Sequence, residues 1–357
     1  MSTNIQHSQN LFNFDAKENT MTQRMDYHNK QESSSKLKVG GLFAGIGGIE
    51  LGFKKAGFKI SWANEIDKNA AITYRMNHKH KLFEKDLKEL QTHEVEKIDI
   101  LTGGFPCQAF SVAGYRKGFE DDRGNVFFEI LRFIDDLKPK ILFLENVKNL
   151  KGHDNGNTFK TILTELESRG YHISHKVLNS SEYANVPQNR ERIYIVGFKD
   201  KIIHENFEFP KPKKLTKTVN DLLDDEAEDK FYYTKSKYYP QLKEEMKNTD
   251  TVYQWRRKYV RENKSKLCPT LTANMGTGGH NVPLIIDKKD IRKLTPVECY
   301  KLQGVKDEDI SLVVSNTQAY KIAGNAMSVN VIQSILRSIY KNKVQNLKRR
   351  NNVWSIR

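Results

Sequence analysis

Between residues 37 and 198, short apolar runs alternate with stretches of helical periodicity, and this alternation restricts the chain to few folds. The runs are KVGGLF, KISWAN, IDILTGG, ILFLENV, HISHKVLN and RIYIVGF, separated by helical candidates such as DKNAAITYRMNHKH and VFFEILRFIDDLK. The second candidate stops at Pro139, because the residue before a proline disfavours helical geometry. The pattern is typical of βαβ units and predicts an α/β fold, a mostly parallel sheet with helices on both faces. Ligands of such folds bind outside the carboxyl ends of the strands.

The rest of the chain follows other patterns. Residues 1–36 are polar and aperiodic, and we expect a disordered arm there, the alternative being a short segment that binds a partner. Residues 37–198 form the first domain. A loop-rich region with acidic, tyrosine-rich and glycine-rich stretches begins a smaller second domain over 199–318. A long amphipathic helix is predicted for 319–342, where it returns to the first domain, and a basic tail for 343–357.

The composition favours some classes of protein over others. Lys and Arg total 59 against 44 Asp and Glu, a formal charge of +15 that favours a polyanionic partner such as nucleic acid, although some basic proteins have none. No segment approaches the run of about 18 apolar residues that a membrane span needs. The first residues lack the layout of a secretory signal. Three scattered cysteines favour the reducing cytoplasm over a disulfide framework.

The first motif is GGLFAGIGGIELGF, residues 40–53, where a strand enters a glycine-rich loop before a helix. Glycines at these places let a ligand approach backbone N–H groups at the start of the helix. The loop lacks the dinucleotide fingerprint, because Glu50 stands where the third glycine is needed. Taken alone, the loop is more often only a tight turn.

Two acids follow the loop at the ends of later elements. Glu65 lies twenty positions after Gly45, where an acid can accept hydrogen bonds from both ribose hydroxyls of a nucleoside. Asp86 and Leu87, past the following helix, are candidates to hold an adenine amino group and ring. The alternative is that Glu65 and Asp86 are solvated caps.

The second motif is Pro106-Cys107-Gln108, one residue after the run IDILTGG. An ordinary thiol is only a few per cent ionised at neutral pH, so a nucleophilic cysteine needs a nearby cation or helix N-terminus. Most cysteines are buried and inert, and we accept that interpretation for Cys268 and Cys299. For Cys107 it fits less well, because the flanking QAFSVAGYRKGFEDDRGN is charged, glycine-containing and suited to a lid.

Two further motifs carry ionisable groups. Glu145 follows the strand ILFL, and a carboxyl there beside an apolar site would have a raised pKa and could donate a proton. Arg190 and Arg192 lie two residues apart, so on a strand both guanidiniums would reach one ligand. Taken singly, each of these groups is more often part of a salt bridge.

Together these motifs resemble the DNA (cytosine-5)-methyltransferases of bacterial restriction–modification type. The matching segments, in the family's order from about residue 38 to 335, are FAGIGG, NEID, GGFPCQAFSVAG, ENV, QNRERIYIVGF, RKLTPVECYKLQG and AGNAMSVNV. The resemblance implies the Rossmann-like sheet of S-adenosylmethionine-dependent methyltransferases, with the second domain as the target-recognition domain. It implies S-adenosylmethionine as cofactor and no metal.

The resemblance also assigns roles to residues. Cys107 would be the nucleophile, Glu145 would contact ring nitrogen 3 of cytosine, and Arg190 and Arg192 would steady the base. The implied cofactor pocket consists of Phe43, Ala44, Gly45, Ile46, Gly47, Gly48, Glu65, Ile66, Asp86, Leu87, Pro106, Asn325 and Ala326. The candidate DNA-binding residues, which could read base edges or grip phosphates, are Gln108, Ser111, Arg123, Arg256, Arg257, Asn274, Gly276, Gly278 and Gly279.

The expected function is methyl transfer to carbon 5 of a cytosine flipped out of a specific double-stranded DNA sequence. We expect a monomer that protects host DNA from a partner restriction endonuclease without contacting it. Three alternative functions are disfavoured. Methylation of cytosine in tRNA is disfavoured by the residue before Pro106 and by the long variable region. An inactive DNA-binding regulator would have lost Cys107 or Glu145, and Glu50 disfavours an NAD-dependent oxidoreductase.

Overall fold

The computed structural model describes residues 37–105, 125–256, 258–277 and 281–339. Its chain divides into two units, Met1–Leu37 and Lys38–Arg357, and every element below belongs to the second. The predicted arm (1–36) and basic tail (343–357) lie outside the described residues. In the part of the chain that is described, no helix is long and apolar enough to cross a membrane.

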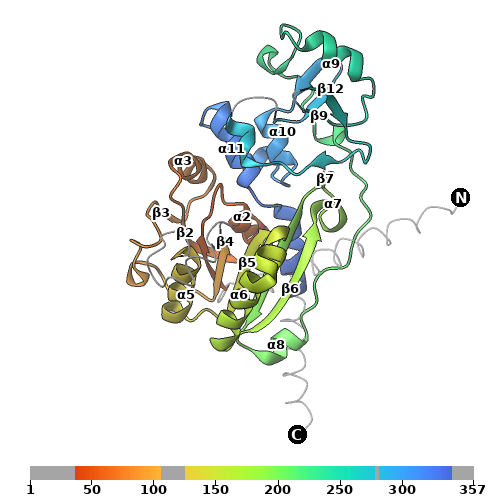
Figure 1. The fold of residues 1–357 in the computed structure, drawn as a ribbon. Helices are drawn as coiled ribbons and strands as arrows, with labels where there is room; N and C mark the ends of the chain where they lie inside the picture. The colour runs from red at the N-terminus through yellow and green to blue at the C-terminus, as the bar shows by residue number, and fades with distance from the viewer. Residues whose placement is uncertain (1–36, 106–124, 257, 278–280, 340–357) are drawn as a thin grey trace, which may run out of the picture. The chain divides into compact units, whose positions relative to one another are not determined.

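A seven-stranded sheet in the order β3-β2-β1-β4-β5-β8-β6 forms the base of the fold (Figure 1). β3, β2, β1, β4 and β5 run parallel, and β8 lies antiparallel between β5 and β6. The strands are β1 (Lys38–Leu42), β2 (Lys59–Asn64), β3 (Lys81–Phe83), β4 (Ile100–Gly104), β5 (Ile141–Val147), β6 (His172–Asn179) and β8 (Glu191–Phe198). The prediction of a mostly parallel sheet is confirmed, with β3 as an additional strand. β8 is antiparallel because the short link after β6 leaves no length for a crossover helix.

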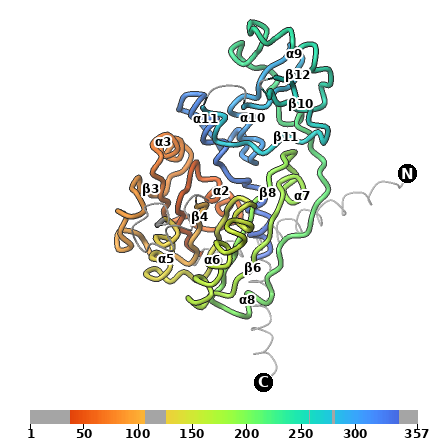
Figure 2. The backbone as a smooth tube through the Cα atoms, in the orientation of Figure 1, coloured from red at the N-terminus to blue at the C-terminus, as the bar shows by residue number. Residues whose placement is uncertain are grey.

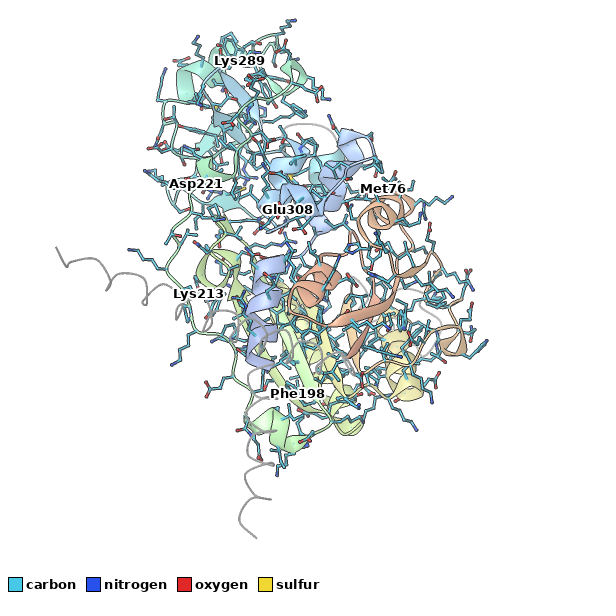
Figure 3. All side chains as sticks on the ribbon, turned by 180° about the vertical axis from the view of Figure 1, so that it is seen from behind. Met76, Phe198, Lys213, Asp221, Lys289 and Glu308 are labelled. Atoms are coloured by element: carbon cyan, nitrogen blue, oxygen red, sulfur yellow. The ribbon has the colours of Figure 1, made fainter. Side chains whose placement is uncertain are left out.

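Helices cover both faces of this sheet. On one face α5 (Asn125–Leu137) and α6 (Asn157–Ser168) bury Phe133 and Leu166 against sheet residues such as Leu142. On the other face lie α2 (Gly48–Lys55) and a helix over 329–339, seen from behind in Figure 3. These two helices meet closely, because a Cβ on Gly52 would lie 2.7 Å from Ile332 Cγ2. α3 (Lys68–Asn77) follows β2. The small helix α7 (Ser180–Tyr183) follows β6, and α8 (Lys201–Glu205) follows β8.

The prediction of a single long helix over 319–342 is wrong. The chain forms α11 (Asn316–Asn325), breaks at Ala326, whose ψ is 154°, and resumes as the 329–339 helix. The buried guanidinium of Arg190 binds the carbonyl oxygens of Gly324 and Ala326, which a continuous helix would use for its own N–H groups. The break therefore turns the end of α11 toward Arg190.

The second half of the chain forms a smaller sheet in the order β10-β9-β12-β13, which is antiparallel. Figure 2 shows the chain running from α8 toward this sheet, past α7, where Lys213 N donates to Glu182 O. The elements are α9 (Tyr239–Glu245), β9 (Tyr253–Trp255), β10 (Val260–Glu262), β12 (Leu284–Ile286), β13 (Ile291–Lys293) and α10 (Pro296–Lys301). A two-stranded pairing joins β7 (Gln188–Asn189) to β11 (Cys268–Pro269). The short 3₁₀ segment η7 (Ala273–Thr277) follows β11.

Candidate active site

One pocket of about 400 Å³ lies at the carboxyl ends of β1, β4 and β5 and is completed by α11. Small-molecule sites in proteins fall in the range of roughly 300–1,000 Å³. Of the residues predicted for cofactor or catalysis, its lining includes Phe43, Ala44, Gly45, Ile46, Gly48, Glu65, Glu145, Arg190, Arg192, Asn325 and Ala326. The lining does not include Gly47, Ile66, Asp86 or Leu87. Motifs spread over nearly 290 residues of sequence therefore meet at the edge where α/β folds bind ligands.

The glycine-rich loop takes left-handed backbone conformations between β1 and α2. Gly45 has φ 59° and Gly47 φ 85°, values that favour glycine. A Cβ on Gly45 would meet nothing within 4 Å, so the backbone there is open to a ligand. A Cβ on Gly47 would instead collide with the His78 ring, whose Nε2 lies 3.0 Å from Ile46 O. His78 thus supports the loop from behind, and no local pattern in the sequence indicates this role.

Glu65 fixes the loop from its other side. Its Oε2 accepts a hydrogen bond from Gly45 N at 2.7 Å, and its Oε1 accepts one from Asp67 N at 2.7 Å. Burial raises the pKa of Glu65, and these backbone N–H groups oppose that shift. A carboxylate offers about four acceptor sites, so Glu65 keeps lone pairs for the hydroxyls of a ligand.

Asp86 and Leu87 do not line this pocket. Asp86 Oδ1 accepts from Lys88 N at 2.9 Å in a turn, and Leu87 is buried in the apolar cluster under α5. Ile66 is 60% exposed at the turn before α3.

Glu145 presents a buried carboxyl at the end of β5. It is 5% exposed, and Arg192 Nε lies 3.1 Å from its Oε1, although that oxygen accepts no hydrogen bond from the described residues. Burial raises the pKa of Glu145, whereas the charges of Arg192 and Arg190 oppose the rise without cancelling it. A carboxyl that keeps its proton to higher pH can act as a general acid.

Asn146 holds the chain that leads to Cys107. Its side-chain Nδ2 donates to Phe105 O at 2.9 Å, at the last described residue before Pro106. Its Oδ1 accepts from Val147 N at 2.8 Å, which fixes the amide's orientation. Asn146 was not among the predicted site residues, although its place beside Glu145 in the ENV motif was a signal for it.

Arg190 differs from Arg192 in its environment. It lies between β7 and β8 rather than on a strand, and it is 2% exposed. Its Nη1 donates to Leu271 O at 2.8 Å, and its Nη2 donates to the carbonyls of Gly324 and Ala326. Burial, followed by the charge of Arg192, lowers its pKa to about 9. Four of its five N–H donors belong to the two terminal nitrogens that make these bonds, so Arg190 chiefly joins three chain segments.

Several predicted residues lie outside the described part of the chain: Pro106, Cys107, Gln108, Ser111, Arg123, Arg257, Gly278 and Gly279. Of the other candidates for DNA binding, Arg256 is exposed and Asn274 contacts Thr272, whereas Gly276 is buried against α11. Cys268 and Cys299 are fully buried, and burial raises the pKa of both thiols. Within the described ranges, no group of three His, Cys, Asp or Glu is placed to hold a metal ion.

Comparisons with known proteins identify the family of the chain. Residues 37–341 match the family model described as C-5 cytosine-specific DNA methylase. The chain is 57% identical over 311 residues to the Type II methyltransferase M.Bsp6I of Bacillus sp. (strain RFL6), covering 85% of this chain and 99% of that protein. It is 37% identical over 325 residues to the Type II methyltransferase M.HhaI of Haemophilus parahaemolyticus, covering 87% and 96%.

Solved structures show the same fold at lower identity. The Entamoeba histolytica methyltransferase EhMeth has a TM-score of 0.69 at 18% identity, covering 87% of this chain and 99% of that chain. A mutant Spodoptera frugiperda DNMT2 has a TM-score of 0.67 at 18% identity, covering 85% and 100%. The family model matches most of the chain, and the chain covers these two relatives almost from end to end. The chain belongs to the C-5 cytosine-specific DNA methylase family and is a DNA (cytosine-5-)-methyltransferase.

Proposed function

We propose that the protein transfers a methyl group from S-adenosylmethionine to carbon 5 of a cytosine flipped out of double-stranded DNA, through a covalent adduct with Cys107. The observation that carries this proposal is the position of Glu145. A buried carboxyl with a raised pKa shares one pocket with a glycine-rich loop and with Arg192, so an acid and a nucleotide-binding loop face the same space.

The pocket suits the proposed cofactor. Gly45 leaves open backbone, Glu65 keeps lone pairs for ribose hydroxyls, and Phe43 offers an apolar surface. Asn325 and Ala326, at the broken end of α11, would complete the enclosure. When bound, S-adenosylmethionine supplies an electrophilic methyl group.

The residues of the chain would perform the remaining chemistry. The Cys107 thiolate forms a bond to carbon 6 of the cytosine, which makes carbon 5 electron-rich. Glu145 gives its proton to ring nitrogen 3, so no negative charge accumulates on the ring, and Arg192 holds Glu145 and the base in place. After methylation a base removes the carbon 5 proton, the electrons restore the ring double bond, the bond to sulfur breaks, and nitrogen 3 returns its proton to Glu145.

DNA must open for this reaction, because a stacked base exposes neither carbon 6 nor nitrogen 3. Flipping a base costs a few kcal/mol, and the formal charge of +15 favours binding to the phosphate backbone. We assign target recognition to residues 199–318. Since the similar proteins M.Bsp6I and M.HhaI are named Type II methyltransferases, we infer that this enzyme protects DNA from a partner endonuclease. We further propose that it acts as a monomer.

Trapping with 5-fluorocytosine tests the covalent step. Fluorine at carbon 5 prevents the final elimination, so the enzyme should stay bonded to an oligonucleotide that carries this base at the target. The adduct should appear as a shifted band on a denaturing gel, require the cofactor, and vanish in Cys107→Ser. Cys299→Ser, which removes a fully buried thiol, is the matched control and should still form the adduct. Trapping of Cys107→Ser at the wild-type rate would refute the assignment.

Bisulfite sequencing identifies the substrate and the target sequence. DNA and tRNA from cells expressing the protein are compared with those from cells expressing Cys107→Ser. Methylation at one short DNA sequence is expected. Methylation confined to tRNA would contradict the proposal.

A further inference from the structure

The segment 271–277, called here the recognition segment, is packed directly on α11. A Cβ on Gly276 would lie 2.7 Å from Lys321 Cβ and would collide with Thr317 O, and a Cβ on Gly324 would collide with the backbone of Thr272. Two glycines, one on each partner, thus permit a contact between backbones. The recognition segment cannot shift relative to α11 without disturbing the backbone that carries Lys321.

Lys321 also reaches the rim of the active-site pocket. Its Nζ donates to Asp67 Oδ2 at 2.7 Å, which joins α11 to the turn between β2 and α3 (Figure 1). Both residues line the pocket. Their side chains are 42% and 32% exposed, so the pair lies at the opening and not in the core.

Asp67 is fixed on its other sides. Its Oδ1 accepts from the backbone N–H groups of Asn69 and Ala70 at the start of α3, and its own N–H donates to Glu65. Burial alone would raise the pKa of Asp67, but the hydrogen bonds from Lys321 and from these amides lower it below its usual range. The carboxyl is therefore ionised at neutral pH, and Lys321 is the partner that a movement of α11 would displace.

We propose that Lys321 is a positioning residue that couples the recognition segment to the cofactor pocket, by closing on Asp67 when the segment is seated on α11. The inference rests on the proposed function. By linkage, DNA that seats the segment should tighten cofactor binding, and the cofactor should tighten DNA binding by the same factor. A partly exposed ion pair is weak, so we expect the Lys321–Asp67 pair to contribute a factor of about three to this mutual increase in affinity.

Calorimetric titration of the full chain with S-adenosylhomocysteine, with and without a saturating target duplex, measures this coupling. In the wild type the duplex should tighten binding. In Lys321→Met the duplex-induced gain in affinity for S-adenosylhomocysteine should be about threefold smaller, and Lys321→Arg should restore it. Raising the salt concentration should narrow the gap between wild type and Lys321→Met, because exposed charges are screened.

Two further variants separate this role from a general loss of structure. Lys55→Met removes the ion pair of Lys55 with Asp309, which also joins distant parts of the chain but does not line the pocket. In this variant the duplex should tighten binding of S-adenosylhomocysteine as much as in the wild type. Gly276→Ala should push the recognition segment off α11 and reduce the gain, although the side chains of Lys321 and Asp67 are both retained in this variant. A full gain in Lys321→Met, or no gain in the wild type, would overturn the inference. Failure of the wild type to bind S-adenosylhomocysteine at all would overturn the proposed function with it.

Discussion

Arg192 Nε lies 3.1 Å from Glu145 Oε1, yet the two groups do not neutralise each other as a surface ion pair would. Glu145 is 5% exposed, and the loss of water outweighs the attraction of two arginines, so its pKa is raised. The result is a buried carboxyl whose pKa stays raised although a cation lies beside it. That combination suits proton donation to a bound base.

Replacing Glu145 by glutamine should lower the rate of methyl transfer about 100-fold or more, because an amide cannot donate the required proton. Single-turnover transfer from tritiated S-adenosylmethionine measures this rate. In the wild type the acid form is lost as pH rises through the raised pKa of Glu145, so the rate should fall on the alkaline side; Glu145→Gln should lack that limb. Glu191→Gln, which removes an exposed carboxyl paired with Lys148, is the control and should retain activity. Equal rates for wild type and Glu145→Gln would exclude Glu145 as the acid.

Arg190 and Arg192 should respond differently to replacement by methionine. Arg190→Met leaves the carbonyls of Leu271, Gly324 and Ala326 without their donor, and the expected loss in free energy of unfolding is roughly 3 kcal/mol. Arg192→Met should change stability less and lower the methyl-transfer rate more. Urea unfolding and single-turnover assays on both variants give the comparison. A fully stable Arg190→Met would mean that the three carbonyls find other donors.

The contrast between these arginines shows what a sequence can and cannot predict. The spacing of Arg190 and Arg192 predicted one strand with both side chains on one face, but the strand is interrupted at Arg190 because its guanidinium binds carbonyls from segments far along the chain. Long-range partners of this kind leave no local pattern. The break at Ala326 was not predicted for the same reason, because the carbonyl of Ala326 accepts a hydrogen bond from Arg190.

The sheet and the meeting of the motifs were predictable for a physical reason. Alternating apolar runs and helical stretches can bury their surfaces only as a layered α/β fold, and the carboxyl ends of parallel strands share one edge. Glu65 and Glu145, at the ends of two strands, were therefore expected at one edge of the sheet, and both line the pocket. Asp86 was expected there from its position and from the resemblance, but it does not line this pocket, and its carboxyl accepts a hydrogen bond within its own turn.

Gly47→Ala should be more damaging than Gly57→Ala, although both glycines have positive φ, 85° and 92°. Left-handed backbone costs a non-glycine residue about 1–2 kcal/mol in either case. At Gly57 a Cβ meets nothing within 4 Å, whereas at Gly47 it collides with His78, which supports the cofactor loop. Gly47→Ala should therefore also weaken binding of S-adenosylhomocysteine in a calorimetric titration. Equal binding by the two variants would show that His78 moves aside without disturbing the loop.

Glu50 should make the protein lose stability as pH rises. It is 1% exposed, neither carboxyl oxygen has a hydrogen-bond partner among the described residues, and burial raises its pKa from 4.5 to about 8. Between these two values the folded chain keeps a proton that the unfolded chain has released. The contribution of this proton to the free energy of unfolding is therefore greatest below pH 4.5. As the pH rises from 4.5 to about 8, that contribution decreases by roughly 1.4 kcal/mol per pH unit, and above pH 8 it is gone.

Glu50→Gln removes this titration while keeping the shape of the side chain. Urea unfolding at a series of pH values should show that the stability of the wild type relative to Glu50→Gln falls between pH 5 and 8 by about 4 kcal/mol. Ionisable groups distant from Glu50 contribute equally to both proteins and cancel in the difference. Below pH 4.5 and above pH 8 the difference should be flat, because the protonation of Glu50 is then the same in the folded and unfolded chains. A difference independent of pH throughout would mean that Glu50 ionises at its ordinary pKa, with water or a partner reaching its carboxyl.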